Sequence, residues 1–169
     1  MVTLELVKTL ILLRHAKSDY PAGVPDHDRP LAPRGIREGA LAGDWLRAHA
    51  PVVDAVLCST ATRTRQTLAR TEIDAPVQFV DRLYDATPGI ALSEVNKTGE
   101  DVTTLLLIGH EPVMSSLALG LAGPGSSKET IEAIEHKYPT SSIAVLELRT
   151  PWSALELGGA ELRKFHVPR

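Results

Sequence analysis

The sequence has little of what would stabilise a secreted protein or anchor a membrane protein. Its 169 residues include one cysteine, Cys58, so no disulfide can form within the chain and a reducing compartment is expected. The apolar run at residues 10–13 stops at Arg14, so it is too short for a signal-peptide core. No window approaches the ~20 apolar residues that a membrane span needs. We therefore expect a soluble, cytoplasmic protein.

The chain also lacks a large excess of charge of either sign. Its net charge is −3, so no overall basic field directs it to nucleic acid or to an anionic membrane. A local basic site can still bind a small anion. Hydrophobic residues make up 43% and charged residues 23%, which is ordinary for globular proteins. A chain of this length buries roughly two thirds of its unfolded surface. We expect a single domain over residues 1–169 that needs neither disulfide nor metal to fold.

Short apolar runs alternate with longer helical patterns along the chain. Unbroken or alternating apolar residues predict strands at 9–15, 52–59, 77–80, 102–110, 141–148 and 161–167, the last of them at an edge. Amphipathic or proline-led segments predict helices at 34–49, 61–71, 89–97, 112–122 and 126–137. The spacing of Ser126 and Glu129 suggests a capping box at the start of the last helix. This alternation predicts an α/β three-layer sandwich with a mainly parallel sheet.

Charged side chains follow three of the predicted strands. Arg14 and His15 end the first, Arg63 lies on the helix after the second, and His110 ends the strand at 102–110. In such sheets ligands bind beyond the carboxyl ends of the strands, near helix N-termini that attract anions. Two guanidinium groups and two imidazoles at that edge would form a phosphate site. The long polar segment at 16–33 follows the first strand, and loops of that length are often functional.

Five stretches in these positions resemble one family. "LLRHAKS", "STATRTRQT" and "LIGHEPV" resemble the signatures of the histidine phosphatase superfamily, which includes phosphoglycerate mutases and acid phosphatases. "DRPLAPRG" and "PTSSIAVLEL" resemble the SixA phosphohistidine phosphatase branch, whose chains are similarly short. The five stretches occur in the family's order from residue 10 to residue 148. The resemblance implies a phosphoglycerate mutase-like fold.

The resemblance also implies roles for individual residues. His15 would be the nucleophile that becomes phosphorylated, while Arg14, Arg63 and His110 would stabilise charge on the transferred phosphoryl group. We expect the two guanidinium groups to lower the pKa of His15 and keep it neutral. Lys17 and Ser18 are candidates for substrate binding. No metal and no cofactor are required.

The residue that would protonate a leaving group is left open by the sequence. Family members that cleave alkyl phosphates use a carboxylate for this purpose, and Asp85 in "RLYDATP" stands at a comparable place. The alternative is that Asp85 is a turn residue before Thr87 and Pro88. A phosphohistidine needs less help, because its imidazole leaves easily once protonated. The sequence offers a weak or absent general acid and few insertions that could form a cap over the site. Both features favour a phosphorylated protein as the substrate.

Three functions remain open at this point. The favoured one is a metal-independent phosphatase that acts on phosphohistidine of a partner protein through a phosphohistidine on His15. The second is a phosphomonoesterase for a small sugar or nucleotide phosphate, and the third is a phosphate-binding module without turnover. The other four histidines fit no motif and are interpreted as surface or packing residues: His27, His49, His136 and His166. Arg29 is expected either to pin the long loop or to touch substrate, with the loop role preferred.

Overall fold

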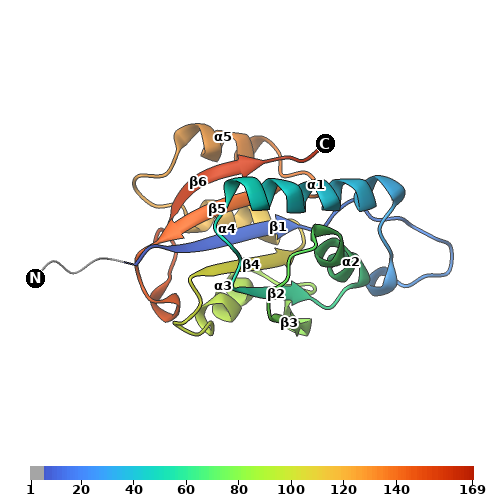
Figure 1. The fold of residues 1–169 in the computed structure, drawn as a ribbon, viewed down its shortest axis with the longest axis horizontal. Helices are drawn as coiled ribbons and strands as arrows, with labels where there is room; N and C mark the ends of the chain where they lie inside the picture. Colours follow the sequence, from blue (N-terminus) through green and yellow to red (C-terminus); the bar gives the residue numbers. More distant parts are fainter. Residues whose placement is uncertain (1–5) are drawn as a thin grey trace, which may run out of the picture.

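A computed structural model describes residues 6–169. They form one six-stranded sheet in the order β3-β2-β4-β1-β5-β6 (Figure 1). The four strands β3, β2, β4 and β1 are parallel, while β5 runs antiparallel to both of its neighbours, β1 and β6. The strand bounds are β1 Lys8–Arg14, β2 Ala55–Ser59, β3 Val77–Val80, β4 Thr104–Gly109, β5 Ile143–Leu148 and β6 Glu161–His166. The predicted α/β class with a mainly parallel sheet is confirmed.

Helices cover both faces of the sheet. In Figure 1, α1 (Pro33–His49) and α2 (Thr62–Thr71) lie in front of the sheet, and α4 (Val113–Leu121) lies behind it. The helices α3 (Pro88–Asn96) and α5 (Lys128–His136) share the apolar cluster of α4 on that second face. Separate clusters of buried residues fill the two sides, and the central strands β1 and β4 contribute to both. Both faces of these strands are covered, which explains their unbroken apolar sequences.

Helices begin with backbone N–H groups that have no partner within the helix. In this protein some of these groups are absent because the residue is proline, and others are hydrogen-bonded by a side chain. Pro33 and Pro88 begin α1 and α3, where a missing N–H is tolerated. The capping box predicted from Ser126 is wrong by one residue. Ser127 is the N-cap of α5, and its hydroxyl accepts a hydrogen bond from the Thr130 N–H at 3.2 Å. The hydroxyl of Ser126 donates instead to the Gly123 carbonyl.

The long segment after β1 is ordered by a few contacts of its own. A 3₁₀ turn, η1, spans Asp26–Asp28, and Ser18 and Leu31 form an isolated antiparallel bridge at the base of the loop. In Figure 1 this loop extends beyond the ends of the parallel strands, on the side toward which the β1 arrow points. The loop therefore lies at the edge of the sheet where the charged residues were predicted.

Among residues 6–169, the helices are all too short or too polar to cross a membrane. A cytoplasmic location remains a prediction.

Candidate functional site

The candidate site lies where neighbouring parallel strands end. Arg14 is the last residue of β1 and pairs with Gly109, the last residue of β4. The next residue, His15, continues this ladder by donating its N–H to the Gly109 carbonyl at 3.0 Å. Its own carbonyl accepts from the N–H of Ser141, just before β5. His15 is thus held by backbone bonds on both sides, which fixes where its ring points.

The ring of His15 has one nitrogen committed to the backbone. Its Nδ1 lies 2.8 Å from the carbonyl oxygen of Ala16, which can only accept, so Nδ1 carries the proton and Nε2 has the lone pair. The residue is 7% exposed. Desolvation, assisted by the charges around it, lowers the pKa of His15 from 6.5 to about 3. The imidazole is therefore neutral at physiological pH.

A second imidazole faces the first across the site. The ring centroids of His15 and His110 are 5.2 Å apart. The Nε2 of His110 is 2.8 Å from the hydroxyl of Ser59, the last residue of β2. Burial, and then the nearby Arg63 charge, lower the pKa of His110 to about 4. Both rings are neutral, and Ser59 fixes the orientation of the second.

The two arginines are oriented through their terminal nitrogens. Arg14 donates from Nη1 to the carbonyl of Tyr138 at 2.8 Å. Arg63 donates from Nη1 to the main-chain carbonyl of Asp26 at 2.8 Å and from Nη2 to its carboxylate at 3.2 Å. Each guanidinium is therefore held by the protein on one side while its Nε–H remains unpaired.

Unpaired polar atoms concentrate at this corner of the molecule. Within residues 6–169, six buried side-chain nitrogen or oxygen atoms lack a hydrogen-bond partner. Five of the six belong to residues at or beside the site: Arg14 Nε, Arg63 Nε, His110 Nδ1, Ser141 Oγ and Ser142 Oγ. Buried polar atoms are nearly always paired in folded proteins, so such a concentration indicates a place where a polar ligand binds.

The helix α2 is tied to the site by a threonine in the "STATRTRQT" motif. The hydroxyl of Thr67 accepts from the N–H of Ala16 at 2.9 Å and donates to the carbonyl of Arg63 at 2.7 Å. Thr67 is fully buried, so both bonds are shielded from water. The side chain links the residue after His15 to the backbone that carries Arg63.

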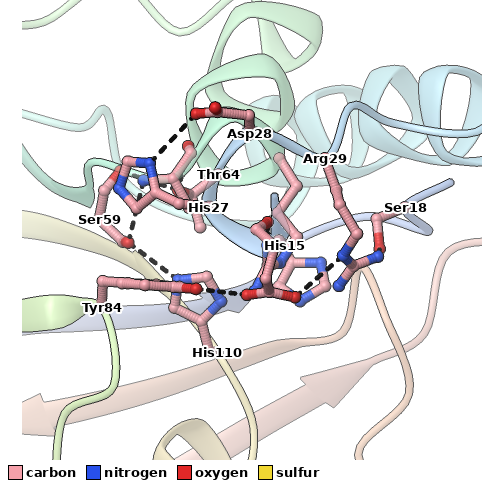
Figure 2. A network of polar contacts seen from close by, with 12 residues as sticks. His15, Ser18, His27, Asp28, Arg29, Ser59, Thr64, Tyr84 and His110 are labelled. Atoms are coloured by element: carbon pink, nitrogen blue, oxygen red, sulfur yellow. Dashed lines mark hydrogen bonds and ion pairs between the residues drawn. The ribbon is translucent and has the colours of Figure 1, made fainter. Parts of the chain in front are cut away.

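Three residues at the site were not foreseen as site residues. Asp26 accepts hydrogen bonds from Arg63, from Arg29 at 3.0 Å and from the hydroxyl of Tyr84. The ring of Tyr84 packs edge-on against His110 and His27, at centroid distances of 5.6 and 4.7 Å. In Figure 2 the rings of Tyr84, His27 and His110 lie on one side of His15, and Arg29 lies on the other.

Only one sequence signal pointed toward these residues, the length of the polar loop that carries Asp26 and His27. The interpretation of His27 as a surface or packing residue was incomplete, because its Nε2 lies 3.0 Å from Thr60 Oγ1 beside the site. Tyr84 had no signal beyond its position next to Asp85. Hydrogen bonding from Tyr84, then from the arginines, holds the pKa of Asp26 well below its usual range. Asp26 is therefore an ionised carboxylate.

The structure places Lys17 and Ser18 differently from each other. Lys17 is exposed, and its carbonyl accepts from the Ala32 N–H across the base of the loop. Ser18 is buried, and its hydroxyl accepts from Arg29 Nη1 at 2.7 Å (Figure 2). Arg29 also donates to the carbonyl of Asp19. These contacts hold the loop together, which is the role that was preferred for Arg29 from the sequence.

Asp85 is separated from this network. It is exposed, has a φ of 55°, and makes no hydrogen bond or ion pair with any residue between 6 and 169. Its neighbour Tyr84 makes the contacts with the site instead. Cys58 is buried in β2, and burial raises the pKa of its thiol to about 12, so it is not an available thiolate.

No metal-binding arrangement of His, Cys, Asp and Glu side chains is present in the described part of the chain. The absence of a metal or cofactor requirement remains a prediction.

Comparison with known proteins identifies relatives along nearly the whole chain. The profile of the histidine phosphatase superfamily (branch 1) matches residues 10–92. An uncharacterized protein of Mycobacterium tuberculosis is 60% identical over 158 residues, which are 93% of this chain and 100% of the relative. Sequence identity at this level, over 93% of this chain, implies the same fold.

Two solved structures of similar length carry the same architecture. A protein from Nakamurella multipartitia, assigned as a phosphohistidine phosphatase SixA, is 39% identical with a TM-score of 0.88, covering 96% of both chains. Its counterpart from Agrobacterium tumefaciens is 29% identical with a TM-score of 0.80, covering 95% of this chain and 99% of the other. Since both the sequence profile and these structures agree with the motifs, the chain belongs to the histidine phosphatase superfamily, in its SixA-like branch, and is a phosphatase.

Proposed function

We propose that this phosphatase works through a covalent phosphohistidine on His15 and that its substrate is phosphohistidine on a partner protein. The observation that carries the proposal is the state of the His15 ring. Its Nδ1 faces the Ala16 carbonyl at 2.8 Å, so Nε2 is left with a lone pair, and the ring is neutral. A neutral, oriented imidazole is the form that attacks phosphorus.

The groups around the ring suit a phosphoryl group in transfer. Its three equatorial oxygens carry the developing charge, and preorganised donors to them supply most of the catalysis. Arg14 and Arg63 each keep an unpaired Nε–H, and His110 keeps an unpaired Nδ1. We assign these three side chains as the donors, together with the positive field of the two guanidinium groups.

The reaction then has two displacements. The lone pair of His15 Nε2 forms a bond to phosphorus, while the bond to the leaving nitrogen breaks and its electron pair returns to the leaving ring. Water next attacks the same phosphorus, the bond to Nε2 breaks, and its pair returns to His15. The protons of the water remain on the dihydrogen phosphate that is released, and Nδ1–H is retained throughout.

The leaving group separates the favoured substrate from the alternatives. An alkyl ester needs a protonated acid at its leaving oxygen. Asp85, the candidate for that role, is exposed and makes no hydrogen bond or ion pair with the described residues of the site. A protonated phosphohistidine departs as neutral imidazole without such an acid. The positions of these residues support a phosphorylated protein side chain over a sugar or nucleotide phosphate.

The test is to trap the intermediate. After rapid quench with a 32P-labelled phosphohistidine peptide, we expect acid-labile label on His15, and none in His15→Ala. His136→Ala, which changes an exposed histidine of α5, is the matched control and should label normally. Full activity of His15→Ala on an aryl phosphate would refute the nucleophile. Phosphate binding without any trapped label would indicate a binding module.

The small-molecule alternative is tested on the same preparation. If a panel of sugar and nucleotide phosphates is hydrolysed faster than the peptide, and Asp85→Asn abolishes that activity, the protein is a phosphomonoesterase for metabolites. We expect the peptide to be preferred and Asp85→Asn to have little effect on it.

A further inference from the structure

We propose that Asp26 is the leaving-group residue of this site: its carboxylate accepts a hydrogen bond from the distal ring N–H of an N-phosphorylated imidazole. The inference rests on the proposed function and names a residue that decides which leaving groups are accepted. Asp26 lies in the 3₁₀ turn η1 of the loop at 16–33, just before the "DRPLAPRG" stretch.

Asp26 lies on the side of the site where the leaving group is expected. In an in-line displacement the leaving group lies opposite the attacking nitrogen. His15 is 7% exposed and forms the floor of the site, so the leaving group must face solvent. The side chain of Asp26 is 56% exposed, although it contacts the buried guanidinium of Arg63. It therefore reaches from the phosphoryl-binding arginine to the solvent side.

Three donors from different elements hold this carboxylate in place. They are Arg63 on α2, Arg29 in the loop and the hydroxyl of Tyr84, which follows the 3₁₀ turn at Asp81–Leu83. The Tyr84 ring in turn packs against His110. A carboxylate has about four acceptor positions, so a further donor from a substrate can still be accepted.

An ionised carboxylate in this position favours one kind of leaving group. It cannot protonate an alkyl oxygen, but it stabilises a positive imidazolium ring. A phosphorylated imidazole that is protonated on its distal nitrogen breaks its N–P bond toward His15. The electron pair returns to the proximal nitrogen, and the ring departs neutral with its distal N–H still bonded to Asp26. The lowered pKa of Asp26 agrees with this role.

The decisive comparison uses Asp26→Asn and two small substrates. Phosphoimidazole has the leaving group in question, whereas p-nitrophenyl phosphate has one that needs no proton. Asparagine keeps an acceptor oxygen, and the main-chain carbonyl of Asp26 still holds Arg63 at 2.8 Å. We expect kcat/KM to fall about 10- to 100-fold on phosphoimidazole, the usual value of a hydrogen bond to a charged group. On p-nitrophenyl phosphate it should change less than about threefold.

Asp28→Asn provides the matched control, because Asp28 lies in the same turn and its nearest ionic partner is His27, at 3.6 Å. We expect that variant to behave as the wild type on both substrates. Equal losses on the two substrates in Asp26→Asn would overturn the inference, because they would show that Asp26 only positions Arg63. Unchanged phosphoimidazole turnover would overturn it as well.

The pH profile gives a readout that a structural role would not move. A nearby anion raises the pKa of a bound imidazolium, so the reactive protonated substrate persists to higher pH in the wild type. The groups that face Asp26 are Arg63, Arg29 and Tyr84, with His27 and Asp28 beside it in the turn. In Asp26→Asn we expect the alkaline limb of kcat on phosphoimidazole to move down by about one pH unit. An unmoved limb contradicts the inference.

The inference and the proposed function fail in different ways. If the wild type hydrolyses phosphoimidazole but no phosphohistidine protein, the proposed substrate is wrong while the Asp26→Asn comparison still decides the inference. If His15→Ala stays active, the nucleophile is wrong. If the wild type does not cleave phosphoimidazole at all, the role of Asp26 is refuted directly.

Discussion

Burial and nearby charges both lower the pKa of the His15 imidazole, but by different amounts. The sequence predicted that two guanidinium groups would lower its pKa, and the direction is confirmed. The cause differs, because desolvation is the largest effect and the electrostatic effects of His110, Arg63 and Arg14 are smaller. The bond to the Ala16 carbonyl opposes the shift, since it stabilises the protonated ring. Sequence can place charges near a histidine, but its burial depends on everything packed around it.

Arg63 and Arg65 lie two residues apart on α2 and allow a matched test at the residue scale. Arg63 is 6% exposed and contacts the site, whereas Arg65 lies over the ring of Phe79, 4.1 Å from its centroid. We expect Arg63→Ala to lower kcat on p-nitrophenyl phosphate about 10²- to 10³-fold, the usual cost of losing one preorganised donor. Arg65→Ala should remain near wild type. Similar losses in both variants would remove Arg63 from the phosphoryl-binding set.

At the scale of elements, the helix α1 depends on its glycines for close packing. Glycine disfavours helix, yet Gly35, Gly39 and Gly43 all lie within a 17-residue helix from Pro33 to His49. A Cβ on Gly35 would lie 2.1 Å from the Lys17 carbonyl, and one on Gly43 would lie 2.2 Å from the Thr71 carbonyl. The glycines therefore let α1 approach α2 and the segment after His15. Helix propensity favours other residues here, and tertiary packing overrides it.

Replacing one of these glycines should strain the contact. We expect Gly35→Ala to lower the free energy of unfolding by about 1–3 kcal/mol or more, the usual cost of overpacking. Urea denaturation measures the change. Gly89→Ala in α3 is the control, because its Cβ would meet only the Thr87 hydroxyl at 3.9 Å. Equal stability of Gly35→Ala and the wild type would show that the loop after His15 moves freely away from α1.

At the scale of the whole molecule, the order of the strands assembles the site. The strand β1 lies between β4 and β5. Arg14 therefore contacts Tyr138, and His15 contacts Gly109, although each pair is about a hundred positions apart in sequence. The crossovers put the ends of four parallel strands at one edge of the sheet. The same packing excludes water from His15 and His110, which couples the site to stability.

This coupling predicts a loss of stability in mild acid. The pKa values of His15 and His110 are about 3 and about 4 in the folded protein, below the ordinary value of 6.5. Between these values the unfolded chain binds more protons, so stability is full above pH 6.5 and declines as the pH falls. We expect the urea midpoint to be lower at pH 5 than at pH 7.

The contribution of His15 can be isolated by substitution. In His15→Gln the difference between pH 5 and pH 7 should shrink, whereas His136→Gln, at an exposed position, should retain it. A difference of the same size in all three proteins would mean that burial of His15 does not drive the effect.

The sequence by itself determined the class of fold and predicted which residues carry the chemistry. Arg14, His15, Arg63 and His110 could be predicted because each lies at or shortly after the end of a predicted strand, at a spacing that resembles one family. Alternation of strands and helices was likewise enough for an α/β sandwich.

Only the tertiary structure decided which further residues join the site and how its side chains are hydrogen-bonded and buried. Asp26, Tyr84 and His27 come to it through a long loop and a turn, whose conformation has no periodic signal in the sequence. Asp85 has a left-handed backbone conformation and lies outside the network, and the neutrality of His15 depends mainly on burial. Hydrogen-bond geometry and exclusion of water arise from contacts between distant segments, which is why local patterns could not contain them.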